Sequence, residues 1–181
     1  VVNPDRLIEE ITTLRAAGVD LSSLRISNRA HVIFPRHIQQ DEESEHLRAF
    51  GTTQQGIWPV YADKAARRGI RVGDLFNPLE AGLQGELQYP QEREWKRVLA
   101  PFVCDSLDVI QNARCILLEG SLGVMRDIDY GIFPYVTSSS CLPAVPGVPA
   151  PTRIIGVFKV YCTSVGAGPF PTEIVGPLAE H

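Results

Sequence analysis

The chain has 181 residues, 44% of them hydrophobic and 21% charged, with 17 basic against 21 acidic side chains and a net charge of −4. This length and apolar content are typical of one globular domain and exclude a wholly disordered chain. The acidic balance argues against a surface that coats nucleic acid or an anionic membrane. The uncharged run at residues 131–152 is long enough to span a membrane, but its five prolines exclude a spanning helix.

The first predicted element is a helix that begins at Pro4 and ends before Gly18. Asn3 is a good N-cap, and proline suits the first helical position. Apolar residues then recur at helical spacing, and Gly18 supplies the left-handed residue that ends such a helix. Residues 1–5 have neither the basic flank nor the apolar core of a signal peptide, so we expect none.

Shorter elements follow along the chain. In order, they are β-type runs at 24–26 and 31–34, a helix with a solvated face at 39–50, a short helix at 61–68, a helical stretch at 92–113 interrupted at Pro101, a buried strand at 115–118 and an apolar strand or helix at 154–161. Buried strands mixed with amphipathic helices indicate the α/β class.

Two segments carry the side chains that bind phosphate in proteins. Gly51-Thr52-Thr53 offers glycine dihedrals, backbone donors and two hydroxyl groups, although a plain surface turn has the same composition. The segment 63–71 places three arginines within five positions, and their guanidinium groups suit phosphate. A solvated helix face paired with Asp63 and Asp74 explains these arginines as well, and composition alone favours that interpretation.

The remaining polar groups are less specific. Asp127 and Asp129 either bind a metal or cap turns through backbone amides, and the second role is the commoner. His31 lies in an apolar run and is expected in the core, whereas His37, His46 and His181 have no partner that the sequence identifies. The four cysteines lack zinc-site spacing, and we expect buried or half-buried reduced thiols. They are Cys104, Cys115, Cys141 and Cys162.

Taken in order, these segments resemble the adenylosuccinate synthetase family over nearly the whole chain. The segments that carry the resemblance are residues 3–18, 29–35, 51–53, 63–75, 127–131, 134–139 and 165–173. The resemblance implies part of a P-loop-like α/β fold with a mixed, largely parallel sheet flanked by helices. Residues 1–181 would form the central portion of a single domain, without the N-terminal phosphate loop and the C-terminal guanine-binding region.

The resemblance also implies a function. The family ligates IMP and aspartate with GTP and Mg²⁺, through a 6-phosphoryl-IMP intermediate, as a cytoplasmic homodimer in purine (AMP) biosynthesis. Thr53 and Thr137 resemble its IMP-phosphate contacts, and Arg67 resembles the arginine that reaches the IMP held by the partner subunit. Further residues would line the nucleotide and aspartate pocket. These are Thr52, Val165 and Gly166.

The chain departs from the family pattern at several positions. Gln55 and Ser164 stand where the family has arginine, and Leu122 replaces the glutamine that helps hold the base oxygen of IMP. The segment after Asp74 is shorter than usual. The family's GDEGKGK loop with its catalytic aspartate, the acid histidine, the aspartate-binding loop and the guanine motif are absent from these 181 residues, which favours an excerpt from a longer protein.

We therefore expect the catalytic residues and the ligands of GTP and Mg²⁺ to lie outside this sequence, with no metal ligands within it. Three interpretations stay open. The first is a divergent adenylosuccinate synthetase, the second is a related enzyme that uses another purine monophosphate, and the third is a non-catalytic remnant of the fold. The second interpretation is considered because Leu122 cannot hydrogen-bond the base oxygen of IMP as the family's glutamine does.

Overall fold

The computed structural model describes residues 1–78, 89–120, 122–142, 148, 150–157, 159–161, 163 and 166–170. Its elements are α1 (Pro4–Ala16), β1 (Ile26–Ser27), α2 (Pro35–Glu43), α3 (Glu45–Arg48), α4 (Ile57–Ala65), α5 (Val72–Phe76), α6 (Glu92–Leu99), η1 (Ala100–Phe102), β2 (Val103–Cys104), α7 (Ser106–Gln111) and η2 (Val124–Arg126). Among these helices, none has the length and apolar character needed to cross a membrane.

The first helix forms as its sequence predicts. The Asn3 side chain accepts a hydrogen bond from the Arg6 N–H, and Pro4 occupies the first turn of α1. Gly18 follows the helix with a φ of 77°, the left-handed conformation that glycine adopts without steric cost. The cap, the first turn and the stop signal predicted for this helix are therefore confirmed.

The core lies where α1, α5 and α6 pack around a short parallel strand pair. Ile26 of β1 pairs with Val103 of β2, and this parallel pairing among helices confirms the α/β class. Trp95 is only 1% exposed, and its Nε1 donates to Asp5 Oδ1 at 2.6 Å, which ties α6 to α1. The buried cluster comprises Ile11, Ile26, Val32, Phe34, Ile70, Val72, Leu75, Trp95, Leu99 and Phe102.

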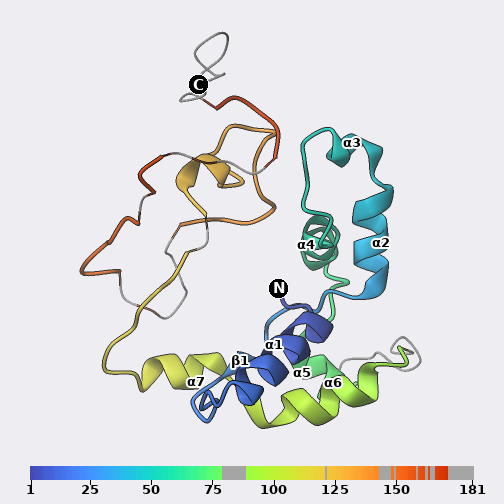
Figure 1. Ribbon diagram of the computed structural model, residues 1–181, viewed down its shortest axis with the longest axis vertical. Helices are drawn as coiled ribbons and strands as arrows, with labels where there is room; N and C mark the ends of the chain where they lie inside the picture. The colour runs from blue at the N-terminus through green and yellow to red at the C-terminus, as the bar shows by residue number, and fades with distance from the viewer. Residues whose placement is uncertain are drawn as a thin grey trace.

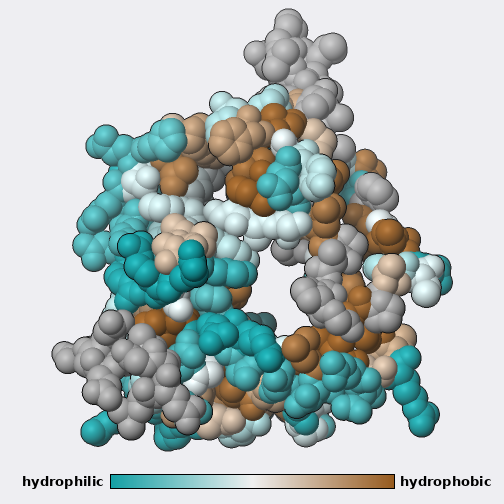
Figure 2. All heavy atoms as spheres, turned by 180° about the vertical axis from the view of Figure 1, so that it is seen from behind, coloured by the Kyte–Doolittle hydropathy of each residue, from teal (hydrophilic) through white to brown (hydrophobic). Residues whose placement is uncertain are grey.

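Two arms rise from this helical base (Figure 1). One arm contains α2, α3 and α4, and the other contains the chain beyond α7, drawn from yellow to red. The arms approach each other again where the Ala167 N–H donates to the Phe50 carbonyl at 2.9 Å. Figure 2 shows the opening that remains between the arms, seen from behind.

The predicted helix at 39–50 differs from the structure in its bounds and in its burial. It is replaced by α2 and α3, which are separated by the cap residue Ser44. The face of α2 expected to be solvated carries Asp41, which is fully buried. The helix predicted at 61–68 begins earlier, at Ile57, because Gly56 with φ 73° starts it, and it ends at Ala65.

Two predictions for apolar runs are wrong: the strand at 115–118 and the strand or helix at 154–161. Residues 115–118 and the described part of 154–161 have no helical or strand structure. Leu117 is 86% exposed, Val157 is 94% exposed, and Cys115 is exposed as well, contrary to the expected buried thiol. An extended segment needs neighbouring strands to satisfy its backbone groups, and the described residues offer these runs none.

Most of the exposed apolar surface lies on this second arm. Brown hydrophobic surface is visible along it in Figure 2. The large hydrophobic residues exposed beyond residue 113 are Ile116, Leu117, Leu122, Val124, Met125, Ile128, Tyr130, Phe133, Leu142, Ile154, Ile155, Val157, Val160 and Tyr161. Exposed apolar side chains concentrated on one part of a chain suggest a surface that another polypeptide segment can cover.

This difference between the arms predicts where trypsin cleaves first. Arg153 and Arg97 are both exposed, but Arg153 lies in irregular chain whereas Arg97 lies within α6. A protease needs a locally opened backbone, so cleavage after Arg153 should be at least about tenfold faster than after Arg97. Mass spectrometry of a digestion time course measures both rates. Equal rates would contradict the exposed, irregular state of the chain around Arg153.

Candidate functional site

The threonine loop between α3 and α4 is anchored by one buried carboxylate. Asp41 Oδ1 accepts from the Thr52 hydroxyl, and its Oδ2 accepts from the Gly56 N–H, both at 2.9 Å. Thr52 Oγ1 in turn accepts from the Gln54 N–H at 3.3 Å. The Thr52 hydroxyl therefore points inward, and its hydrogen is already donated to Asp41. Thr52 was predicted to line the pocket, and in this orientation its hydroxyl has no hydrogen left to donate to a ligand.

Thr53 has the opposite orientation in this loop. It is exposed, and none of the residues that the structure describes bonds its hydroxyl. Its carbonyl accepts from Gln55 Nε2 at 3.2 Å, and Gln54 adopts a left-handed φ of 54°. The loop thus presents one unpaired hydroxyl outward, which is the arrangement an anion-binding loop requires.

A second glycine-rich segment closes against this loop. A Cβ on Gly51 would lie 2.7 Å from Gly166 Cα, and both glycines have positive φ values of 69° and 89°. Only glycine at both positions allows this approach. The predicted pocket residue Gly166 therefore touches the start of the threonine loop, whereas Val165 and Ser164 lie outside the described residues.

The segment that contains Thr137 reaches the same place. The ring of Tyr135 meets Phe50 edge-on at a centroid distance of 5.5 Å, and a Cβ on Gly168 would clash with it. The Tyr135 carbonyl accepts from Arg126 Nη1, and the Thr137 N–H donates to the Arg126 carbonyl, each at 2.8 Å. Three distant parts of the sequence are therefore gathered at Phe50.

Leu122 is not part of this gathering. Its side chain is 48% exposed and lies on the second arm, before η2.

The adjoining pair Asp127 and Asp129 does not act as a metal site. Asp127 instead accepts from the backbone N–H groups of Cys141, Asp129 and Tyr130 and from the Ser140 hydroxyl.

These hydrogen bonds, led by that from Cys141, lower the pKa of Asp127 to about 2 despite its burial. The turn-capping interpretation of Asp127 is thus confirmed. Across the described parts of the chain, no three His, Cys, Asp or Glu side chains converge to hold a metal ion. These residues do not fit a magnesium site, and no step that involves Mg²⁺ is assigned to them.

The arginine segment lies at the other end of α4. Arg68 pairs with Asp63 at 3.1 Å and Arg71 with Asp74 at 3.5 Å, as the solvated-face interpretation predicts. Arg67 differs, because its backbone adopts a left-handed φ of 60° and its exposed side chain has no partner among the residues that the structure describes. A non-glycine residue in this conformation is uncommon and draws attention to its side chain.

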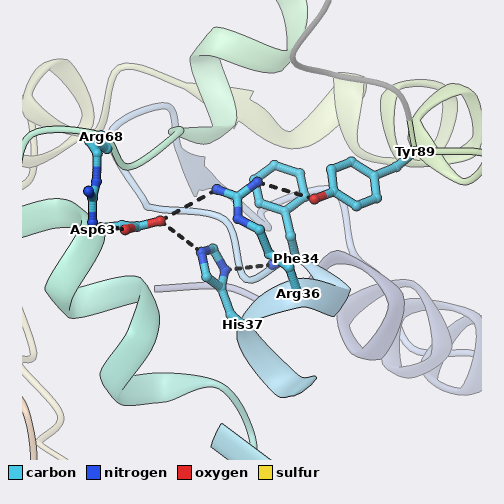
Figure 3. Close-up of polar contacts among 6 residues, drawn as sticks. All are labelled: Phe34, Arg36, His37, Asp63, Arg68 and Tyr89. Atoms are coloured by element: carbon cyan, nitrogen blue, oxygen red, sulfur yellow. Dashed lines mark hydrogen bonds and ion pairs between the residues drawn. The ribbon is translucent and has the colours of Figure 1, made fainter. Parts of the chain in front are cut away.

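Figure 3 shows the polar network that fixes this end of α4. Asp63 Oδ2 accepts from His37 Nε2 at 3.2 Å and from Arg36 at 3.5 Å, while its Oδ1 accepts from Arg68. The Asp63 carbonyl also accepts the N–H groups of Arg68 and Gly69. Burial opposes ionisation of Asp63, but the hydrogen bonds led by His37 and Arg68 outweigh it and lower its pKa.

The tautomer of His37 follows from its neighbours. Its Nδ1 accepts from the Phe34 N–H at 3.0 Å, so Nε2 carries the ring hydrogen and donates to Asp63. Burial lowers the pKa of His37, and the nearby Arg36 charge lowers it further against the opposing effect of Asp63. His37, for which the sequence identified no partner, is thus a neutral buried link between α2 and α4.

His31 lies close to the arginine segment. Burial lowers the pKa of His31, and the charges of Lys64 and Arg71 lower it further, with Asp74 opposing them. His31 is half-buried rather than fully in the core, and its ring packs on Gly69.

Sequence reasoning missed two side chains that hold the site together. Asp41 and His37 lie four residues apart on α2 and share the face that packs on α4. That i, i+4 spacing was the available signal. The charge of the surrounding residues concealed it, because Asp41 stands in a run of acidic side chains that predicts a solvated face.

Together, the fold and the loops define an α/β protein in which segments from three distant parts of the chain meet at Phe50, next to a loop that presents an exposed threonine. A model of the adenylosuccinate synthetase family matches residues 1–181. The chain belongs to the adenylosuccinate synthetase family.

Individual relatives agree with this assignment. The adenylosuccinate synthetase of Moorella thermoacetica is 41% identical over 215 residues, which cover 99% of this chain and 50% of the relative. That of Leuconostoc citreum is 39% identical and is matched over 100% of this chain and 50% of its own length. A structure described as fully ligated adenylosuccinate synthetase from Plasmodium falciparum matches with a TM-score of 0.76 and 31% identity, over 99% of this chain and 50% of that one.

The chain spans about half the length of the curated relatives it matches. The match therefore establishes the family. That this chain takes part in the activity of a full-length relative is a proposal. The alignment with the Moorella relative extends over 215 residues against 181 in this chain, so the relative has additional residues within the matched region.

The buried histidine link predicts how stability depends on pH. Because folding lowers the pKa values of His37 and His31, the unfolded chain binds more protons as the pH falls through 6.5, and the free energy of unfolding decreases from pH 7.5 to 5. Each histidine contributes at most about 1.4 kcal/mol per pH unit. Urea denaturation at each pH measures the slope.

In the same experiment, His37→Gln should reduce that slope and leave a remainder that His31→Gln removes. The slope, and not the absolute stability, is the result to compare, because His37→Gln also loses a hydrogen bond to Asp63. An unchanged slope in the His37 variant would show that folding does not lower the pKa of His37.

Proposed function

We propose that this chain supplies the IMP-binding portion of an adenylosuccinate synthetase, which ligates IMP and aspartate with GTP in purine biosynthesis. Residues 1–181 then form the central portion of one cytoplasmic enzyme domain. The observation that carries this proposal is the closure of Gly166 and Ala167 onto Phe50 and Gly51. It brings the family's threonine loop and its later glycine loop into contact.

The chemistry of the loop supports a phosphate ligand. Thr53 presents an unpaired hydroxyl, and none of the described residues accepts from the backbone N–H groups of Thr53 or Gln55. Phosphate oxygens accept such donors strongly. Thr137, held to Arg126 through its own N–H, is proposed as the second phosphate contact.

Arg67 is proposed to contact the IMP of a partner subunit. The nine residues of α4 separate it from the threonine loop by about 14 Å at 1.5 Å per residue. One phosphate group cannot bridge that separation within a single chain. An exposed arginine without a described partner is suited to reach a ligand held by a second copy.

GTP, Mg²⁺ and aspartate are proposed as further ligands of the complete enzyme. The residues for GTP and Mg²⁺ are expected outside this sequence, and Val165 with Gly166 would border the aspartate and nucleotide pocket. No step of the reaction is assigned to the residues described above. Their proposed part is to bind and orient IMP.

Thr53→Ala tests the proposed phosphate contact. Removing one hydrogen bond to a charged group should weaken IMP binding about ten- to hundredfold, while inosine, which lacks the phosphate, should bind equally to both chains. Isothermal titration measures each affinity. Thr13→Ala is the matched control, because the Thr13 hydroxyl bonds only the Glu9 carbonyl within its own helix. Equal IMP binding by the Thr53 variant and the parent would contradict the proposal.

Arg67→Ala tests the contact in trans. The variant should bind IMP at least about tenfold more weakly, whereas Arg68→Ala and Arg71→Ala, whose side chains pair with their own chain, should change binding less. The decisive measurement mixes Arg67→Ala chains with Thr53→Ala chains. Each mixed dimer then has one pocket with an intact Thr53 and an Arg67 from its partner, so tight binding should reappear.

The control mixture combines the double variant with the parent chain. If Arg67 acts in trans, both pockets of that mixed dimer lack one contact, and no tight site is expected beyond those of residual parent dimers. A first mixture that binds IMP no better than its two separate components would show that Arg67 does not serve the neighbouring subunit.

A further inference from the structure

Asp41 is a fully buried charged group beside the proposed IMP site, and nothing in the family resemblance gives it a role. It is 0% exposed although it belongs to an acidic run. Burying a carboxylate is costly unless hydrogen bonds satisfy it. Both of its oxygens are satisfied by the threonine loop, through the Thr52 hydroxyl and the Gly56 N–H.

These two contacts fix both ends of the turn at once. Thr52 opens the turn, and Gly56 closes it and starts α4 with a left-handed φ of 73°. A Cβ on Gly56 would lie 2.9 Å from the Ile38 N, so the backbone of α2 also lies close against this end of the turn. With both ends held on α2, the residues between them can only project outward.

The orientation of Thr53 depends on this arrangement. The Thr52 hydroxyl donates inward to Asp41, which leaves Thr53 as the threonine that faces solvent. The negative charge of Asp41 would repel a phosphate group, but its oxygens point toward a hydroxyl and an amide hydrogen and lie beneath the loop. An uncharged residue of the same shape should therefore serve equally well.

We propose that Asp41 is a positioning residue for Thr53: its carboxylate holds Thr52 and Gly56 so that the Thr53 hydroxyl and the adjoining backbone donors face the phosphate of a nucleoside monophosphate. The proposal rests on the proposed function, since it assumes that this loop binds the IMP phosphate. It assigns Asp41 no contact with the ligand itself.

The first test measures IMP binding by titration calorimetry. Asp41→Ala should weaken binding about tenfold or more, and Asp41→Asn should restore it to within about threefold of the parent, because asparagine can accept from Gly56 and donate to Thr52. Thr52→Val, which removes one donor with little change of shape, should weaken binding in the same direction if the alanine variant fails to fold. Glu42→Ala, at an exposed neighbouring position on α2, is the matched control.

A double variant separates positioning from general destabilisation. If Asp41 acts through Thr53 and its adjoining backbone donors, Asp41→Ala should weaken IMP binding by a smaller factor in the Thr53→Ala background than in the parent chain. Additive losses would overturn the proposal, as would an Asp41→Asn chain that binds as weakly as the alanine variant.

Amide hydrogen exchange provides a readout that needs no ligand. Asp41→Ala should accelerate exchange at Gly56 and Gln54 about tenfold or more while leaving α1 unchanged. A parent chain that binds no IMP would contradict the proposed function. The exchange rates would then still test whether Asp41 holds the threonine loop in place. Unchanged exchange at Gly56 would overturn the proposed hold on the loop.

Discussion

The packing of α2 on α4 is the constraint on which the proposed site depends. Asp41 of α2 holds Gly56 at the start of α4, and His37 of α2 holds Asp63 near its end. Because both contacts come from one face of α2, they fix α4 along its length. Thr53 precedes the first contact and Arg67 follows the second, so the two proposed ligand groups project from the two ends of one clamped helix. Polar contacts that are buried in this way specify a single arrangement more strictly than apolar packing does.

Local signals in the sequence predicted the parts of the fold that depend on neighbouring residues. The Asn3 cap, Pro4 and Gly18 define α1 without help from the rest of the chain, and the Asp127 turn was correctly predicted to be bound by amides. The roles of His37 and Asp41 could not be found in this way. Their burial depends on the approach of α4, which is set by long-range packing, and a charged neighbourhood in the sequence conceals it.

The apolar runs at 115–118 and 154–161 show the opposite failure. Their composition is that of buried strands, yet Leu117 and Val157 are exposed. A strand is stabilised by partners that can be far away in sequence, so composition alone cannot guarantee that it forms. The full-length relatives have about as much polypeptide outside the matched region as within it. Polypeptide of that length can supply the neighbouring strands that such runs need.

The positions of the two ends of α4 also bear on how many chains a complete site needs. The hydroxyl of Thr53 and the guanidinium of Arg67 both suit phosphate, but they project from loops at opposite ends of α4, a helix about 14 Å long. If one chain sufficed, α4 would have to bend or unwind, which the contacts of Asp41 and the Asp63 network oppose at its two ends. A second copy needs no such distortion, because it can bring its own Arg67 to the Thr53 loop of the first. The rigidity of α4 thus favours a shared site between two chains over a flexible site within one.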